Sequence, residues 1–594
     1  MKKRDKILTT LQGLTSTVKR YPVSIILFLC SAILTSCYIN NNKLTNFSEF
    51  LISFLLGATI YMLLQMIYER FFSGTKIRLV FCAVAILAAT IYYLVLVYVL
   101  KAFNPETVIR TMVIFFILII GFIWIPSIKS KIGFSESFMA VFKAFFIVAF
   151  YAGVLYLGAA LVLMATNNLI VEVDSKAYFH VGSIIAFIYA PIHFLSLIPI
   201  YPGFSENDNL DKVDGETDSD LEELKPSKFL NGLISYIVIP ITTIFTAILL
   251  LYILLNITGD FWKDNLMEPL LVSYSITVIT VYLLASVIDS KATKYFRMVF
   301  PKVLIPVVLF QTVSSILKIG ELGITSGRYY VIMFGIFATI SAVIFSIWPN
   351  KNNNIIAPIL IILSIISILP PVDAFTISKG NQINRLHKVL IKNEMLEDDM
   401  IIPKADLSNE DKEIIRDTIR YLDDMDYIED INWLQSYNET EDFEKTFGFY
   451  QYEWTIKKYE TYNLYLPEKT GIDVSLYDFF IAANLDWNNQ DTNLLAEPWG
   501  DKGYFLILEN TKDNSDLVLM NNTEDELLRY SLNQIFAKIK DRQERSGILS
   551  PNEAEFRIEN DNAIVSIITR NITWEIWEDR EYKNIDAYIM VKIK

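Results

Sequence analysis

Long, uninterrupted runs of hydrophobic residues dominate the first 371 positions of the chain. A helix needs about 20 consecutive apolar residues to cross the hydrocarbon core of a bilayer. Eleven runs meet or approach this length, at 22–39, 50–68, 79–100, 108–126, 138–165, 178–199, 229–256, 267–287, 303–319, 327–347 and 354–371. Short polar loops separate most of them. The pattern therefore predicts an α-helical polytopic membrane bundle of about 11 transmembrane helices.

The pattern changes after Pro370 and Pro371, where hydropathy falls sharply. Apolar positions at helical spacing predict helices at 381–396 and 408–424. The second should start at Ser408, whose hydroxyl can accept hydrogen bonds from unpaired backbone amides. Runs rich in Tyr, Phe, Ile and Val predict strands at 447–455, 461–466, 503–509, 516–520, 553–559, 562–570 and 585–593, with a helix near 523–543. This part is predicted to be a soluble α+β domain with a largely antiparallel sheet.

The predicted organisation has four parts. Residues 1–202 hold spans one to six, and residues 228–378 hold spans seven to eleven. Residues 203–227 are rich in Asp, Glu, Gly, Ser and Asn and cannot bury a core, which predicts a flexible acidic loop. Residues 379–594 form the soluble domain.

Charge is distributed unevenly between these parts. The 594-residue chain has a formal net charge of -14 and a mean hydropathy of +0.36. The soluble part alone carries about 25 Lys and Arg against about 44 Asp and Glu. Nucleic-acid binding is not expected, because phosphates need clustered Lys and Arg. The acidity is typical of a well-solvated surface or of one that meets cationic ligands.

The loops between the runs predict an orientation. With the N-terminus inside, the inner loops carry about 20 Lys and Arg and the outer loops about 7. Eleven spans that start inside must finish outside, so the soluble domain is predicted to be extracytoplasmic. One span more or fewer would place it in the cytoplasm. Leu34–Cys37 resembles a lipoprotein processing box, but the long charged leader and the many later spans favour an uncleaved first helix.

Few residues offer catalytic or metal-binding chemistry. The three cysteines lie in apolar runs, and the chain has only three histidines, His180, His193 and His387. This composition predicts no disulfide framework, no metal site and no cofactor. No phosphate-binding glycine loop, zinc-ligand spacing or nucleophile elbow is present. The sequence therefore predicts no catalytic residue and favours a role other than that of an enzyme.

Candidate binding residues lie near predicted membrane surfaces. His193 is the one histidine expected near membrane depth, where it could bind a ligand or a proton or simply lie at the interface. Before span ten, residues 320–330 form a Gly- and Ser-rich turn that leads into Arg328, Tyr329 and Tyr330. Arg328 could bind a lipid phosphate or pair with Glu321, and the tyrosines suit interfacial anchoring.

A second polar stretch follows the last span. Gln382 and Arg385 are three residues apart and share one face of the predicted helix. This stretch and the turn before Arg328 both lie on the predicted outer surface. The two are therefore expected to pack against each other.

The order of spans, the stretch Gly323–Tyr330 and the later stretch Gln382–Leu386 together resemble a bacterial membrane family known as domain of unknown function 4153. The resemblance covers roughly residues 10–480. It implies a multi-pass bacterial inner-membrane protein. The family supplies no established activity and no catalytic residues.

Two functions from different classes follow. In the first, the bundle sits in the bacterial inner membrane and anchors an extracytoplasmic domain that binds a ligand, an envelope component or a partner protein. In the alternative, the chain is a transporter or lipid-handling protein with a path between the two helix groups. A membrane-bound envelope enzyme is less favoured, because acid–base residues do not cluster. Polar residues along a continuous cavity would favour transport, whereas a sealed bundle beside a grooved domain would favour binding.

Overall fold

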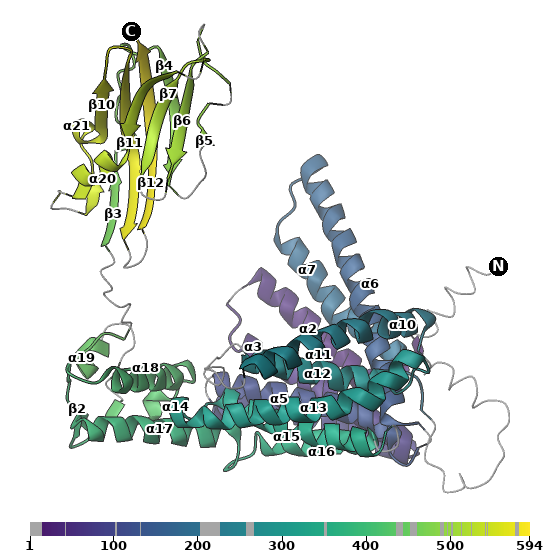
Figure 1. The fold of residues 1–594 in the computed structure, drawn as a ribbon. Helices are drawn as coiled ribbons and strands as arrows, with labels where there is room; N and C mark the ends of the chain where they lie inside the picture. Colours follow the sequence, from purple (N-terminus) through teal and green to yellow (C-terminus); the bar gives the residue numbers. More distant parts are fainter. Residues whose placement is uncertain are drawn as a thin grey trace. The chain divides into compact units, whose positions relative to one another are not determined.

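The structure is a computed structural model, drawn as a ribbon in Figure 1. It describes residues 15–41, 43–100, 104–130, 132–201, 226–256, 267–349, 353–434, 437, 443–451, 460–487, 492–495, 497–500, 503–511, 514–523, 525–540, 542, 545–576 and 581–594. The chain divides into two compact units, a helical unit (Met1–Phe449) and a C-terminal unit (Tyr450–Lys594). The predicted loop 203–227 lies outside the described residues except at its last two positions.

Helices that are long and apolar enough to cross a membrane build the helical unit. The described residues contain ten of them. They consist of α2 (Pro22–Asn40), α3 (Phe47–Phe71), α4 (Thr75–Leu94) with a π-helical end, α5 (Pro105–Trp124), α6 (Phe134–Leu169), α7 (Lys176–Ile184) continued through a π-helical turn by α8 (Ala190–Ser196), α10 (Lys228–Leu233) continued likewise by α11 (Ile239–Asn256), α12 (Met267–Ala285), α13 (Lys291–Leu317) followed by α14 (Ile319–Leu322), and α15 (Ser326–Ile347). This confirms the predicted polytopic helical bundle.

The predicted eleventh span corresponds to a shorter helix, α16 (Ile356–Ile366). The segment from Asn353 to Ile368, which contains this helix, runs antiparallel to α5. Before α16, Asn353 donates to Ser135 Oγ at 2.8 Å in the first turn of α6, the helix that follows α5. After α16, the carbonyl oxygen of Ile368 accepts from Arg110 near the start of α5. The segment therefore connects the two ends of the bundle, although its helix is too short to do so alone.

At one end of the helical unit three arginines bind backbone carbonyl oxygens, and we call it the basic end. There Arg20 donates to the carbonyl oxygen of Ile198 at 2.7 Å, and Arg70 donates to that of Ile128 at 3.0 Å. Arg297 likewise donates to carbonyl oxygens at the end of α12. Guanidinium groups suit these positions because the last carbonyl groups of a helix have no partner within it.

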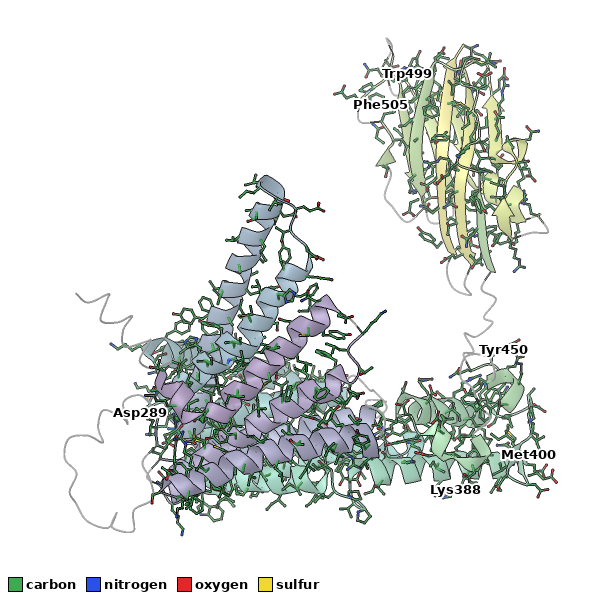
Figure 2. The ribbon with its side chains drawn as sticks, turned by 180° about the vertical axis from the view of Figure 1, so that it is seen from behind. Asp289, Lys388, Met400, Tyr450, Trp499 and Phe505 are labelled. Carbon is green, nitrogen blue, oxygen red and sulfur yellow. The ribbon has the colours of Figure 1, made fainter. Side chains whose placement is uncertain are left out.

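The opposite end, where α5 and α15 begin, is called the α17 end, after the helix that starts there. Figure 2 shows Asp289, in the turn after α12 at the basic end, and Lys388 on α17 at the other side of the helical unit. Helix α13 extends between the two ends. It begins earlier than the predicted span 303–319, because Ser290 accepts a hydrogen bond from the amide of Thr293 and so fixes the start of the helix at Lys291.

Three polar helices and a short pair of strands complete the helical unit. The helices are α17 (Ala374–Lys392), α18 (Asn409–Asp424) and α19 (Phe443–Phe447), and the two-residue strands are β1 (Leu396–Glu397) and β2 (Met400–Ile401). Ser408 begins α18 as predicted, with its hydroxyl 3.1 Å from the amide of Asp411. Their hydrophobic core also contacts Ile109 of α5 and the two tyrosines of α15. This shared core explains why 379–449 belongs to the helical unit rather than to the separate domain that the sequence placed from 379 onward.

The C-terminal unit is built from two sheets that share one hydrophobic core. One sheet has the order β4–β12–β11–β3–β9, with β10 paired to β11, and the other has the order β5–β6–β7–β8. The elements are β3 (Glu460–Tyr465), β4 (Phe479–Asp486), β5 (Thr492–Asn493), β6 (Phe505–Asn510), β7 (Ser515–Met520), β8 (Glu526–Ser531), α20 (Asn533–Lys540), β9 (Ser546–Ile548), α21 (Pro551–Ala554), β10 (Glu555–Glu559), β11 (Ala563–Ile576) and β12 (Glu581–Ile593). All neighbouring strands pair antiparallel except β3 and β9, which confirms the predicted sheet type.

Two predicted elements of this region differ from the structure, and three strands outside them were not predicted. The missed strands are β4, β5 and β9. The predicted helix at 523–543 is instead a strand, β8, followed by the shorter helix α20. The predicted strand 447–455 begins at the last residue of α19, and its second half lies outside the described residues.

Candidate functional site

The site lies at the α17 end and starts from the first turns of α5. Asn104 caps this helix, with its side-chain oxygen 2.9 Å from the amide of Thr107, and Pro105 occupies the first helical position. The cap places Glu106 and Arg110 four residues apart on one face. Arg110 Nε donates to Glu106 Oε1 at 2.9 Å.

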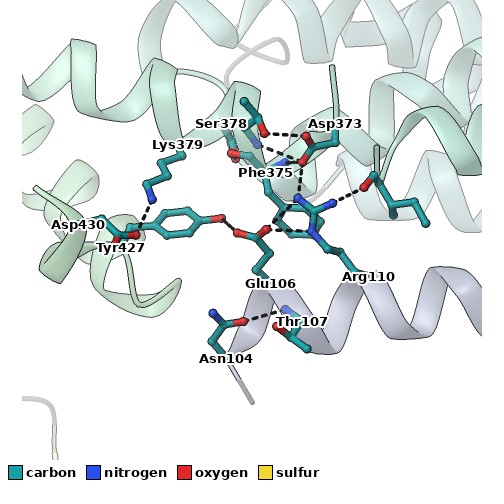
Figure 3. A network of polar contacts seen from close by, with 12 residues as sticks. Asn104, Glu106, Thr107, Arg110, Asp373, Phe375, Ser378, Lys379, Tyr427 and Asp430 are labelled. Atoms are coloured by element: carbon teal, nitrogen blue, oxygen red, sulfur yellow. Dashed lines mark hydrogen bonds and ion pairs between the residues drawn. The ribbon is translucent and has the colours of Figure 1, made fainter. Parts of the chain in front are cut away.

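Arg110 joins α5 to the segment between α16 and α17 (Figure 3). Its Nη2 lies 2.8 Å from Oδ1 of Asp373, its Nη1 donates to the carbonyl oxygen of Ile368, and its guanidinium lies 4.7 Å from the ring centre of Phe375. Asp373 is fully buried and caps α17, because it accepts from the amides of Phe375 and Thr376. A single guanidinium therefore connects two carboxylates and one helix start.

Tyr427 extends this network to the polar helices. Its hydroxyl donates to Glu106 Oε2 at 2.8 Å, and the ammonium of Lys379 lies 4.6 Å from the centre of its ring (Figure 3). Lys379 also pairs with Asp430 at 2.5 Å. We call Glu106, Arg110, Asp373 and Tyr427 the clasp.

The protonation states of the clasp follow from its contacts. Burial alone would raise the pKa of Asp373, but hydrogen bonds from Thr376 and the charge of Arg110 outweigh it and hold the pKa below the ordinary value of 3.8. Burial and the carboxylate of Glu106 raise the pKa of Tyr427, so its hydroxyl stays a donor. The clasp contains no activated nucleophile, and its geometry serves to hold segments together.

A second set of contacts joins the turn before α15 to α17. The side-chain oxygen of Asn381 accepts from the amide of Ile324 at 2.8 Å, and Gln382 Nε2 donates to the carbonyl oxygens of Leu322 and Ile324, each at 3.2 Å. Gly323 has a φ of +71°, and a Cβ added there would lie 2.7 Å from Gln382 Nε2. Only glycine permits both this backbone conformation and this close approach.

The structure brings together five of the six candidate binding residues. Arg328 Nη1 donates to the carbonyl oxygen of Gly323 at 2.8 Å, and Arg385 donates to that of Glu321. Tyr329 donates through its hydroxyl to the carbonyl oxygen of Val372 at 2.6 Å. The remaining two are Gln382, which holds the turn, and Tyr330, whose ring centre lies 6.3 Å from that of Phe375.

His193 lies apart from this group, on α8, which ends near the basic end. Its ring packs against Tyr151 and Tyr189, with centroid distances of 5.8 and 5.4 Å. These contacts are typical of a packed aromatic side chain.

A cavity of about 710 Å³ lies beside the clasp. It is lined by α5 and the start of α6, from the first helix group, and by α12, α15 and α16, from the second. Most of the described lining is aliphatic or aromatic, as at Val113, Ile276 and Phe334, and none of it is charged. Thr280 and Ser364 are among its few polar members. Hydroxyl groups of Tyr330 and Ser367 lie in the part of the lining nearest the clasp. The volume is in the range of small-molecule sites.

Sequence reasoning missed the clasp. Arg110 lies inside the predicted span 108–126, where an ionisable residue is costly and therefore marks a site. Applying that rule to each span would have found it. Asp373 and Glu106 carry local signals of helix starts only, so their pairing with Arg110 could not be read from the sequence.

Comparison with known proteins gives one match. The family described as Domain of unknown function (DUF4153) matches residues 23–399, more than half of the chain. The chain belongs to this family. No curated protein matches the chain, and no solved structure does. The DUF4153 match includes the cavity, Glu106, Arg110, Asp373 and the Arg328 turn, but it ends before Tyr427 and the C-terminal unit.

Proposed function

We propose that this membrane protein binds the acyl chain of a lipid in the cavity between its two helix groups. The apolar lining of that cavity is the observation that carries the proposal. A hydrated solute would lose its hydrogen bonds to water in such a lining, whereas an acyl chain loses none. The lining therefore supports the lipid-handling alternative over the transport of a polar solute.

Photolabelling tests this function. The protein in lipid nanodiscs is exposed to a long-chain fatty acid that carries a diazirine, and labelled peptides are mapped. We expect labelling of α5, the start of α6, α12, α15 and α16 at the cavity. Val113→Trp should reduce it severalfold because the indole fills the space.

The matched control is Ile119→Trp on the same helix. Ile119 is 47% exposed and does not line the cavity. Labelling of the cavity should persist in this variant. Equal labelling of the wild type and of Val113→Trp would refute the proposed site.

We further propose that the bundle lies in the bacterial inner membrane and anchors the C-terminal unit, as a ligand- or partner-binding module, on its extracytoplasmic side. Two observations support this placement. The loops at the end where α2 begins carry about 20 Lys and Arg against about 7 in the opposite loops, which matches the cytoplasmic side under the positive-inside rule. The α16 segment then brings the chain to the α17 end, away from the basic end.

Reporter fusions at the C-terminus test the orientation. A phosphatase that is active only outside the cytoplasm should be active there, and a fluorescent protein that matures only inside should stay dark. The opposite pair of results would place the C-terminal unit in the cytoplasm. Fusions after Lys351, expected inside, provide the control.

A further inference from the structure

Arg328 and Arg385 converge on one turn from two helices. Arg328 Nη1 contacts the carbonyl oxygen of Gly323, and Arg385 contacts that of Glu321, two residues earlier. The side-chain Cδ of Arg385 lies 3.3 Å from the position of a Cβ on Gly323. Two guanidinium groups thus lie around the same short stretch of backbone.

Both groups retain buried donors without partners. Among the described residues, Nε of Arg328 and Nη1 of Arg385 are shielded from solvent and form no hydrogen bond. The described chain also shows no ion pair to either guanidinium within 4.0 Å. Burial lowers the pKa of Arg385, and the charge of Arg328 acts in the same direction against that of Asp417. Two adjacent cations with unused donors are expected to have an anionic partner.

The position of Arg328 relates this pair to the cavity. Val331, Phe334 and Phe337 follow it at intervals of three residues on α15, and all three line the cavity. On α12, Glu268 lies one turn before the lining residue Val272. Arg328 therefore lies one helical turn beyond the apolar lining, at its α17 end.

We propose that Arg328 and Arg385 bind the phosphate group of an anionic lipid whose acyl chain occupies the cavity. This inference rests on the proposed function and adds the headgroup class. Guanidinium groups bind phosphate through paired N–H donors in a planar fork. The N-terminus of α15, at Ser326, adds a favourable partial positive charge.

Two carboxylates lie near this site without occupying its unused donors. Glu268 is the carboxylate whose charge acts on Arg328, and its Oε1 is occupied by the hydroxyl of Ser315. Asp417 acts in the same way on Arg385, but among the described residues neither carboxylate forms an ion pair with Arg328 or Arg385 within 4.0 Å, so the unused N–H donors stay open to a further anion. Arg110 cannot serve the same purpose, because Glu106, Asp373 and Ile368 already occupy its donors.

The test compares two lipids with the same acyl chains, phosphatidylglycerol and diacylglycerol. Retention of each by the purified full-length protein is measured by native mass spectrometry. We expect wild-type protein to retain phosphatidylglycerol about tenfold more strongly, and Arg328→Gln with Arg385→Gln to lose this preference. Arg328→Lys and Arg385→Lys keep the charge without the planar fork, so they should fold and show an intermediate preference.

Arg78→Gln is the matched control, because Arg78 contacts backbone carbonyl oxygens near the basic end instead. It should keep the wild-type preference. If the double glutamine variant keeps the preference too, or if the wild type retains both lipids equally, the headgroup site is overturned while acyl-chain labelling still stands. Thermal protection of the wild type by inorganic phosphate, without preference between the lipids, would overturn the lipid assignment. Absence of fatty-acid labelling in the wild type would instead refute the proposed function.

Discussion

Replacing Asp373 with alanine is the most direct perturbation of the clasp. The substitution removes the cap of α17, which is worth about 1 kcal/mol. It also removes one partner of a buried ion pair, which typically costs about 3–5 kcal/mol. Arg110 would keep Glu106 and the carbonyl oxygen of Ile368, so the lower value applies. We expect a total loss of about 4 kcal/mol in the stability of the α17 start.

Hydrogen–deuterium exchange of the protein in nanodiscs measures this loss locally. A change of about 4 kcal/mol corresponds to roughly a thousandfold increase in the open fraction. Amides of α17 should therefore exchange two to three orders of magnitude faster in Asp373→Ala, while α2 and α3 remain as in the wild type.

Ser408→Ala provides the matched control, because it removes only the cap of the neighbouring helix α18. Its effect should be about 1 kcal/mol, or roughly fivefold, and should appear in α18. Acceleration of α17 by less than threefold in Asp373→Ala would refute the view that the clasp holds this helix to the bundle.

Three further predictions follow from the same region. Tyr427→Phe removes a hydrogen bond to the carboxylate of Glu106 and should reduce the protection of α18 against exchange by about 1.5–3 kcal/mol. Gly323→Ala should lower the melting temperature by several degrees, because its Cβ would clash with α17 and its φ is positive. Gly380→Ala should not lower it, because a Cβ added at Gly380 would have no atom within 4 Å. The lowered pKa of Asp373 stabilises the fold at pH values above 3.8. As the pH falls below that value, α17 should lose protection in the wild type but not in Asp373→Ala. Hydrogen–deuterium exchange measured along a pH series checks this.

The bundle could be predicted because the bilayer fixes the length of each apolar run. The C-terminal unit was harder, since local patterns there are ambiguous. Strand β4 exposes Phe480 on one face and half-buries Phe479 on the other, so apolar and polar residues do not alternate at its start. Leu527 and Leu528 of β8 continue the helical spacing of the apolar residues of α20 toward the N-terminus. The sequence of the two elements together therefore resembles that of one helix.

The candidate site was predictable only in part. The packing of the Arg328 turn against Gln382 and Arg385 could be expected, because both stretches lie at the same predicted membrane surface. The clasp could not, because Arg110 and Asp373 are 263 residues apart and meet only when α16 returns along α5. A pairing of this kind depends on which helices are neighbours, and hydropathy does not determine that.

The two charged clusters at the α17 end differ in a way that separates structure from function. In the clasp, two carboxylates and a tyrosine hydroxyl surround Arg110, and its guanidinium has protein partners for each of its nitrogens. A complete buried network of this kind fixes which segments pair, even where its net stabilisation is small. Arg328 and Arg385 lack such partners and lie one turn from an apolar cavity.

The two cations of this second cluster repel each other when no anion is bound, and a bound phosphate group would balance their charge. Arg328→Gln should therefore stabilise the lipid-free protein by relieving repulsion between the cations, and destabilise the protein loaded with phosphatidylglycerol. A loss of thermal stability in both states would show that Arg328 has a structural role alone.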